Sequence, residues 1–438
     1  MAVAAIGVLG LLLAAILLML RAPIPAVLAG VAVAVAALIF GAGSGMPGPG
    51  LAASAVFRDL IELVQTPDIA MIPLFVLLGN VAFYSGISTR IYDAAAVWLR
   101  PMPGGLAMAA VMGCGGFSAI SGSSVACAST MGRICVPEML RAGYDPKLAT
   151  ASVAVGGTLG SLIPPSVLFI LYGIFTDTSI ARLFLAGLLP GLLSLAGMLA
   201  VIAWWVGQHP QAAPRTADAC SSRAEAAIAA WPALLLFAVI VGGIYGGIVS
   251  VTQAAAICVA LTLVIGFAQR RLTPDVLWRA VRESAVQSLT ILLIVAVAKI
   301  FVGVIALTGT AAHVVVWAEV AQMPFFLTIA AVVAVYLLLG LFLDPVSILV
   351  LTLPFAIPLV EAYGLDPIWF GVIVIKLLEI GLITPPVGLN VFVIGQVTPK
   401  VTTDRIFAGV ARFLAVDMLV LLILILFPVV STLLPSSM

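Results

Sequence analysis

Long apolar runs separated by short polar segments make up most of this chain. Such runs are typical of membrane-spanning helices, because crossing the hydrocarbon core takes about 20 apolar residues. The pattern predicts unbroken spans at residues 2–20, 24–40, 67–85, 182–206, 228–249, 251–268, 284–308 and 408–434. Two amphipathic segments, 86–103 and 309–324, are expected to lie along the membrane surface.

Two further apolar regions turn back at their centres. Residues 104–142 are interrupted by the sequence SGSS, and residues 325–362 are interrupted by LDP. Each arm is short for a full crossing, so we predict two re-entrant hairpins that return to the side from which they entered. Residues 147–176 and 366–396 each contain Gly and Pro-Pro, and are predicted to be spans broken near mid-membrane.

The interruptions recur in two halves of the chain. Residues 137–166 and 358–387 share their Pro, Gly, Asp-Pro and Pro-Pro positions without a gap. We therefore predict a duplicated protein, with a first repeat at 1–207, a linker at 208–227 and a second repeat at 228–438. Five crossings per half is an odd number, so the second repeat should be inverted relative to the first. Paired breaks in two inverted halves are typical of a transport site.

The predicted fold is therefore an all-α polytopic membrane protein built from two inverted-topology repeats. Each repeat has five spans, one of them broken, and one re-entrant hairpin. With the amino terminus outside, most of the nineteen Lys and Arg residues fall on the inner side, as the positive-inside rule requires. The linker at 208–227 is then cytoplasmic.

Composition and charge agree with this class and exclude others. Hydrophobic residues make up 63% of the chain and charged residues 8%, while the net charge of +1 gives no reason to expect nucleic acid. Five cysteines and two histidines show no spacing typical of a transition-metal site. The sequence has no nucleophile–base pair and no nucleotide motif, so we expect neither an enzyme nor an ATP-driven pump.

The interruptions predict the chemistry of the site. Backbone groups freed at mid-membrane must be buried in protein or line a water-filled cavity. Free carbonyls and hydroxyls suit a hard cation such as Na⁺, whereas free amides at helix starts suit an anion. We predict cations at two symmetry-related positions and an anionic solute between them. Prolines at 165, 345 and 386 are expected in the first turn of the restarting helices.

Several polar residues have two interpretations from the sequence alone. Asp344 is either an ion ligand or the cap of the helix that restarts at Pro345. Lys376 and Glu379 either neutralise each other or take part in substrate or ion handling. Asn390 is either a hydrogen-bond donor to the solute or a polar packing residue.

Three motifs make a family resemblance specific. GGTLGSLIPPS, EIGLITPPVGLN and SAISGSSVA resemble the large membrane subunit, DctM-type, of TRAP (tripartite ATP-independent periplasmic) transporters of the ion-transporter superfamily. The resemblance covers essentially the whole chain. It implies a multi-pass protein of the bacterial inner membrane, with a periplasmic amino terminus, that imports organic acids such as C4-dicarboxylates by symport with Na⁺ and an elevator mechanism. A periplasmic substrate-binding protein and a separate small four-helix membrane subunit are the implied partners.

The resemblance also assigns site residues. The sodium sites would use the following residues: Ser121, Gly122, Ser123, Ser124, Gly157, Thr158, Asp344, Pro345, Gly381 and Thr384. The solute would contact a smaller set: Ser124, Pro165, Ser166, Pro386 and Asn390.

Two other functions stay open from the sequence. A stand-alone anion or dicarboxylate transporter or antiporter of the same superfamily would share the duplication but need no binding protein. A channel would conduct without stoichiometric sodium.

Overall fold

The structure is a computed structural model that describes residues 2–41, 57–58, 61–63, 65–214 and 223–438. Part of the predicted linker, 215–222, lies outside the described residues. The first half forms α1 (Ala2–Met19), α2 (Ile24–Gly41), α4 (Met71–Tyr84), α5 (Ile87–Leu99), α6 (Gly105–Ser121), α7 (Ser124–Arg141), α8 (Pro146–Gly156), α9 (Leu159–Leu162), α10 (Val167–Thr176) and α11 (Ile180–Gln208).

The second half is also helical in its described residues. It forms α12 (Arg223–Ala229), α13 (Trp231–Phe237), α14 (Gly243–Tyr245), α15 (Val251–Ala268), α16 (Pro274–Leu307), α17 (Thr310–Val320), α18 (Phe325–Gly340), α19 (Pro345–Ala362), α20 (Pro367–Ile383), α21 (Leu389–Val397), α22 (Thr403–Leu426) and α23 (Val429–Thr432).

The helices have the length and surface of membrane spans. Within the described residues, six helices are long and apolar enough to cross a membrane. The number is seven if α4 and α5, which meet at a 63° bend, count as one broken span. Large apolar side chains such as Leu9, Leu289 and Leu422 are exposed on the outer helices. Exposed apolar surface on this scale is suited to lipid rather than water. The prediction of an all-α polytopic membrane protein is confirmed.

One span begins earlier than predicted. Helix α16 starts at Pro274 rather than at residue 284, so part of the expected connector is helical. The Thr273 hydroxyl accepts a hydrogen bond from the Val276 amide at 3.4 Å, and Pro274 occupies the first helical position. A capping hydroxyl followed by proline is a strong helix start, which the apolar pattern alone does not reveal.

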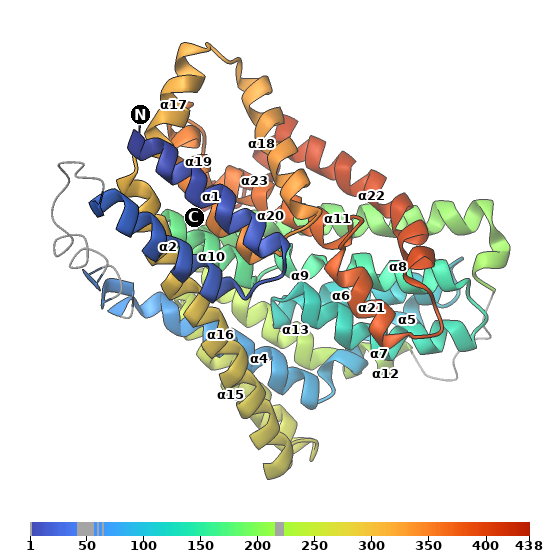
Figure 1. Cartoon of the computed structure of the whole chain (residues 1–438). Helices are drawn as coiled ribbons and strands as arrows, with labels where there is room; N and C mark the ends of the chain where they lie inside the picture. The colour runs from blue at the N-terminus through green and yellow to red at the C-terminus, as the bar shows by residue number, and fades with distance from the viewer. Residues whose placement is uncertain (1, 42–56, 59–60, 64, 215–222) are drawn as a thin grey trace.

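Helices from the two halves interleave throughout the molecule (Figure 1). Helix α8 packs on α22, and α20, at the corresponding place in the second half, packs on α11. The hairpin helix α7 contacts α21, just as α19 contacts α10. The halves are thus joined by reciprocal contacts, while the inverted orientation of the second repeat stays a prediction.

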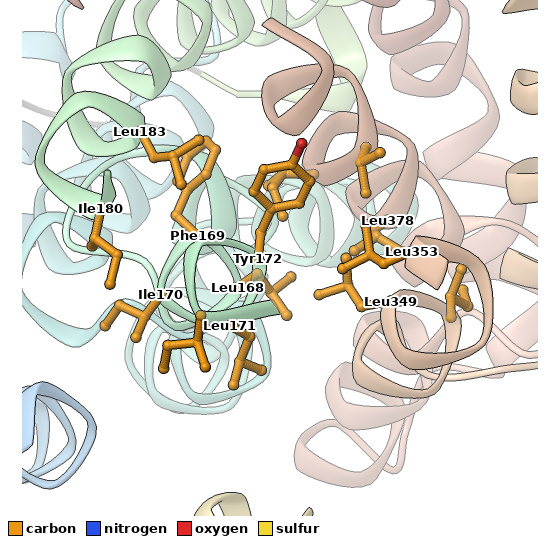
Figure 2. Packing of buried hydrophobic residues seen from close by; sticks show 14 of the residues in the cluster. Leu168, Phe169, Ile170, Leu171, Tyr172, Ile180, Leu183, Leu349, Leu353 and Leu378 are labelled. Atoms are coloured by element: carbon orange, nitrogen blue, oxygen red, sulfur yellow. The ribbon is translucent and has the colours of Figure 1, made fainter. Parts of the chain in front are cut away.

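The two broken segments form the centre of the protein. In the most apolar part of Pro146–Thr176, 94% of the residues are buried, against 39–50% for the other candidate spans. Every residue of α20 from Ile368 to Ile383 is buried as well. Leu168 and Tyr172 of α10 lie on the side of Leu349 and Leu353 of α19, whereas Phe169 and Ile170 lie beside Leu183 and Ile180 of α11 (Figure 2). The Tyr172 hydroxyl donates a hydrogen bond to the Pro367 carbonyl at 2.7 Å, which ties α10 to the start of α20.

Candidate functional site

The first hairpin turns within two residues. Helix α6 ends at Ser121 and is followed by Gly122, whose φ of 63° favours glycine, and α7 begins immediately after Ser123. The Ser123 hydroxyl accepts a hydrogen bond from the Ala126 amide at 3.4 Å and so caps α7. The tip is therefore a helix end and a helix start placed side by side.

This tip contacts the first broken span directly. The Val167 amide, at the start of α10, donates a hydrogen bond to the Gly122 carbonyl at 3.1 Å. A Cβ on Gly122 would lie 2.6 Å from the Pro165 carbonyl oxygen, and a Cβ on Gly160 would lie 2.8 Å from the carbonyl carbon of Ser123. Both glycines are required because backbone packs on backbone here.

Gly160 offers a test of this packing. Replacing Gly160 with alanine places a methyl group against the Ser123 backbone, which cannot rotate away. We expect a loss of about 1–3 kcal/mol of stability, as for other overpacked sites. The thermal unfolding midpoint of the purified protein in detergent measures the effect. The matched control is Gly30→Ala on α2, where nothing lies within 4 Å of the added Cβ; an equal loss in both variants would contradict the packing.

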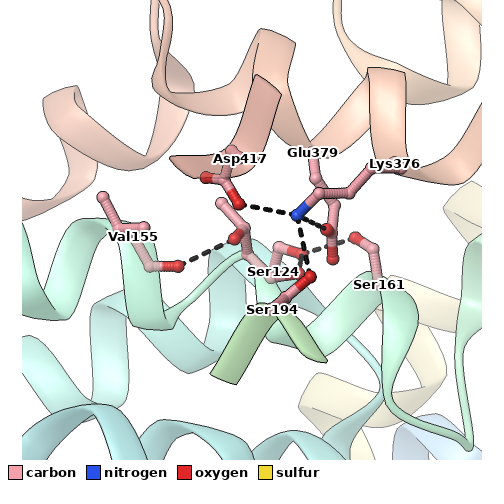
Figure 3. A network of polar contacts seen from close by, with 8 residues as sticks. Ser124, Val155, Ser161, Ser194, Lys376, Glu379 and Asp417 are labelled. Carbon is pink, nitrogen blue, oxygen red and sulfur yellow. Dashed lines mark hydrogen bonds and ion pairs between the residues drawn. The ribbon is translucent and has the colours of Figure 1, made fainter. Parts of the chain in front are cut away.

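Buried hydroxyls surround the first tip. The Ser124 hydroxyl donates a hydrogen bond to the Thr158 carbonyl at 3.2 Å and shares a short hydrogen bond with Ser161 (Figure 3). The Thr158 hydroxyl donates to the Val155 carbonyl at 2.7 Å. The Ser121 hydroxyl is buried and lacks a hydrogen-bond partner. Several hydroxyl and carbonyl oxygens therefore lie close together here, and the Ser121 hydroxyl is the one without a hydrogen-bond partner.

The second tip is organised by Asp344. Its carboxylate accepts hydrogen bonds from the Val346 and Ser347 amides at 3.1 and 3.2 Å, and from the Ser347 hydroxyl. Asp344 thus caps α19, and Pro345 occupies the first helical position, as predicted. A Cβ on Gly381 would lie 3.0 Å from the Gly340 Cα, so the hairpin and α20 also meet backbone to backbone.

The Pro-Pro pairs lie within the breaks rather than at the helix starts. Both Pro164-Pro165 and Pro385-Pro386 are cis peptides. Helix α10 begins at Val167 behind the Ser166 cap, and α21 begins at Leu389 behind Gly388, whose φ is 48°. The prediction that Pro165 and Pro386 occupy the first helical turn is therefore wrong, because serine and glycine take the capping positions after them.

The two tips border a single cavity of about 790 Å³. Its lining includes the first residue of each restarting helix: Ser124 of α7, Val167 of α10, Pro345 of α19 and Leu389 of α21. Of the predicted sodium residues, six line it: Ser121, Gly122, Ser123, Ser124, Asp344 and Pro345. The other four are not among its lining residues: Gly157, Thr158, Gly381 and Thr384.

Only one of the predicted solute contacts lines this cavity, namely Ser124. Pro165 and Ser166 are buried, and Pro386 is exposed outside the lining. The Asn390 side chain is buried and donates a hydrogen bond to the Ala154 carbonyl of α8 at 3.1 Å. The Asn390 amide nitrogen therefore joins the two halves, while its Oδ1 is buried without a hydrogen-bond partner, so both interpretations of this residue stay open.

The cavity lining also includes polar residues that the sequence analysis did not single out. Tyr84 donates a hydrogen bond to the Glu283 carboxylate at 2.8 Å, and the Asn80 amide donates to Ser284 and Gln287 at 2.9 and 3.3 Å. Arg133 is the one cationic residue among those that line the cavity. The sequence signal that could have identified Arg133 as a site residue is its position within a predicted apolar hairpin, where a charged residue is unusual.

Lys376 and Glu379 belong to a larger buried cluster. The Lys376 ammonium donates hydrogen bonds to Asp417 at 2.7 Å, to Ser194 at 3.0 Å and to Glu379 at 3.3 Å (Figure 3). The expected Lys376–Glu379 contact is present, but Asp417 of α22 is the nearer partner. Sequence reasoning missed Asp417 because it lies far from Lys376 along the chain.

Comparison with known proteins decides the family. Residues 11–430 match the family described as "Tripartite ATP-independent periplasmic transporter, DctM component". The chain belongs to this DctM family of TRAP transporters. TRAP large permeases of this family work with a periplasmic binding protein and a small membrane subunit, and they are transporters rather than enzymes.

The relatives of this DctM-family chain cover most of its length. It is 34% identical over 382 residues to the C4-dicarboxylate TRAP transporter large permease protein DctM of Pseudomonas aeruginosa, covering 86% of this chain and 88% of that one. It is 32% identical over 370 residues to the isethionate TRAP transporter permease protein DctMQ of Oleidesulfovibrio alaskensis, covering 82% and 57%. The YdaH transporter of Alcanivorax borkumensis has the same fold, with a TM-score of 0.58 at 15% identity over 87% and 86% of the two chains.

Proposed function

We propose that this DctM-family chain imports an organic anion across the bacterial inner membrane by symport with Na⁺. The solute would be delivered by a periplasmic binding protein, and a separate small membrane subunit would complete the permease. The amino terminus would face the periplasm. The hairpins and broken helices would move together as an elevator, while α1, α2 and the other outer helices stay in place.

The observation that carries this proposal is the convergence of four helix starts on one cavity. Helices α7, α10, α19 and α21 each begin at a residue that lines it. A helix start carries partial positive charge, so the starts of α7, α10 and α21 favour an anion over a neutral solute, whereas the start of α19 already faces the Asp344 carboxylate. The names of the two relatives, which specify C4-dicarboxylate and isethionate, agree with an organic acid.

Oxygen atoms at the two tips support sodium coupling. The unpartnered Ser121 hydroxyl and the Ser124 hydroxyl lie at the first tip, and the Asp344 carboxylate lies at the second. Hydroxyl, carbonyl and carboxylate oxygens are the ligands that hard cations prefer. Sodium bound at both tips would hold the helix starts in place and offset the charge of the arriving anion.

Arg133 would bind the solute at the edge of this cavity. Together with Val125 and Ser129, it also lines an adjoining hollow of about 490 Å³, so it stands where the two spaces meet along α7. No ion pair involves Arg133 among the described residues. Its guanidinium is therefore available to a carboxylate or sulfonate, which it matches with two parallel hydrogen bonds.

Replacing Arg133 with glutamine should raise the KM for uptake by about tenfold or more, because the charge-assisted hydrogen bonds to the solute are lost. Arg133→Lys should recover part of the affinity, since it keeps the charge without the forked geometry. The matched control is Arg405→Gln on α22, an exposed arginine away from the cavity. Equal KM values for wild type and Arg133→Gln would remove Arg133 from the solute path.

The direct test of the function is uptake into proteoliposomes that contain both membrane subunits, with the cognate binding protein outside. A panel of radiolabelled carboxylates and sulfonates should show uptake only with an inward Na⁺ gradient and only with the binding protein. Uptake without the binding protein would instead favour the stand-alone transporter. Flux with no fixed ratio of sodium to solute would favour a channel.

A further inference from the structure

The buried cluster around Lys376 lies outside the proposed sodium and solute contacts. Lys376 and Glu379 come from α20, Asp417 from α22 and Ser194 from α11. The Lys376 side chain is 0% exposed, that of Glu379 1% and that of Asp417 3%. Three ionisable groups this deep in a membrane protein mark a functional site by default.

The hydrogen bonds divide the two carboxylates into unequal partners. An ammonium has three protons to donate, and here Asp417, Ser194 and Glu379 receive them. Asp417 is nearer to the nitrogen, at 2.7 Å, whereas Glu379 lies at 3.3 Å. The second oxygen of Glu379, Oε1, is buried and has no hydrogen-bond partner. Lys376 and Asp417 therefore form the ion pair, and Glu379 is the extra carboxylate.

No other charge in the described structure balances Glu379. Neither Glu379 nor Asp417 makes an ion pair with a cation other than Lys376. Helices α9, α21 and α23, which pack on α20, carry no titratable residue. The other packed helices carry the following groups elsewhere along their length: Arg182 on α11, Asp404, Arg405 and Arg412 on α22, Glu361 on α19, Tyr336 on α18 and Tyr172 on α10. Of these, Arg412 stacks on Trp205 and Tyr172 bonds to Pro367.

Charge counting then identifies what the cluster lacks. One ammonium against two ionised carboxylates would leave a net negative charge in the protein interior, which is strongly unfavourable. A metal cation would need several free oxygen ligands. Among the four side chains of this cluster, two carboxylate oxygens lack a hydrogen bond, Asp417 Oδ2 and Glu379 Oε1, and Glu379 Oε1 is the fully buried one. A proton needs only that oxygen.

We propose that the Lys376–Glu379–Asp417 cluster is a proton-binding site, with the proton held on Glu379. The site lies close to water at the cavity: Leu382, one helical turn after Glu379 on α20, lines the cavity, as does Ser161 of the neighbouring α9. A movement that exposes the turn of α20 between Glu379 and Leu382 to the cavity lets Glu379 exchange its proton with water. Transport then depends on pH, because loss of the proton leaves an unbalanced charge in the moving core.

Infrared spectroscopy of the purified full chain tests the proposal without any transport assay. A protonated carboxylic acid gives a C=O stretch separate from that of carboxylates, and the band shifts in D₂O. Wild type should show this band at neutral pH, and Glu379→Gln should lose it. The matched control Glu361→Gln changes an exposed carboxylate and should keep it. A band that survives in Glu379→Gln, or no band in wild type, would overturn the proposal.

A stability comparison identifies which carboxylate holds the proton. Glu379→Gln exchanges one neutral group for another and should leave the thermal unfolding midpoint nearly unchanged. Asp417→Asn removes the ionised partner of Lys376 and should lower the midpoint by on the order of 5 °C. The reverse order would place the proton on Asp417 and overturn the assignment. If Glu379→Gln does not fold, the assignment fails as well, because a neutral amide should replace a neutral acid.

Discussion

Replacing Lys376 with methionine is expected to destabilise the protein by about 3–5 kcal/mol, because removing one partner of a buried ion pair leaves the other uncompensated. Asp417 would lose its contact at 2.7 Å, and Ser194 and Glu379 would lose their donor. A side chain of similar length without charge keeps the volume of α20 filled, so the loss reports electrostatics rather than a cavity. The unfolding midpoint of the detergent-purified protein is the measurement.

The control for this prediction removes the charges together. The triple variant Lys376→Met, Glu379→Gln, Asp417→Asn leaves no ionised group in the cluster and should recover much of the lost stability, as for other buried ion pairs replaced as a set. Recovery would show that the cost lies in the unpaired charge. If Lys376→Met were as stable as the wild type, this result would contradict the Lys376–Asp417 ion pair.

Replacing Asp344 with asparagine should weaken sodium activation of uptake by about tenfold or more while leaving the fold intact. The side chain has two roles, since it lines the cavity and also caps α19 through the Val346 and Ser347 amides. Asparagine caps helices as well as aspartate does but carries no charge. The loss of one charged ligand is worth about 1.5–3 kcal/mol, enough for a tenfold change. The dependence of the uptake rate on sodium concentration, measured in proteoliposomes, gives the sodium activation of each variant.

Alanine separates the two roles of Asp344. Asp344→Ala should lose the charge and also the cap, with an added stability cost of about 1 kcal/mol. If Asp344→Asn shows the sodium activation of wild type and only Asp344→Ala is impaired, the residue is a cap alone. Sodium would then have to be held elsewhere.

The positions of the helix breaks could be predicted from the sequence because their causes are local. Glycine and proline weaken a helix locally, so the turn at Gly122 and the interruptions at the two Pro-Pro pairs could be predicted from a few residues, although a single proline such as Pro190 stays inside a helix. The start of α19 at Pro345 is local for the same reason. The family also followed from such short motifs.

Contacts between distant segments could not be predicted in this way. Asp417 shows no pattern in the sequence that links it to Lys376, and their contact exists only because α22 packs on α20. Asn390 reaches Ala154 across the two halves, and nothing near either residue specifies that bond. Arg133 has its role only because the cavity forms beside α7. Tertiary packing decides each of these.

The reciprocal packing of the two halves has a consequence for biosynthesis. Part of the surface that covers α8 belongs to α22, which begins at Thr403 and is therefore synthesised well after α8. Until then the amino-terminal segments sit in the bilayer with their polar interruptions uncovered. A chain truncated before α22 should be degraded by membrane proteases, and coexpressing the missing segment as a second polypeptide should protect it.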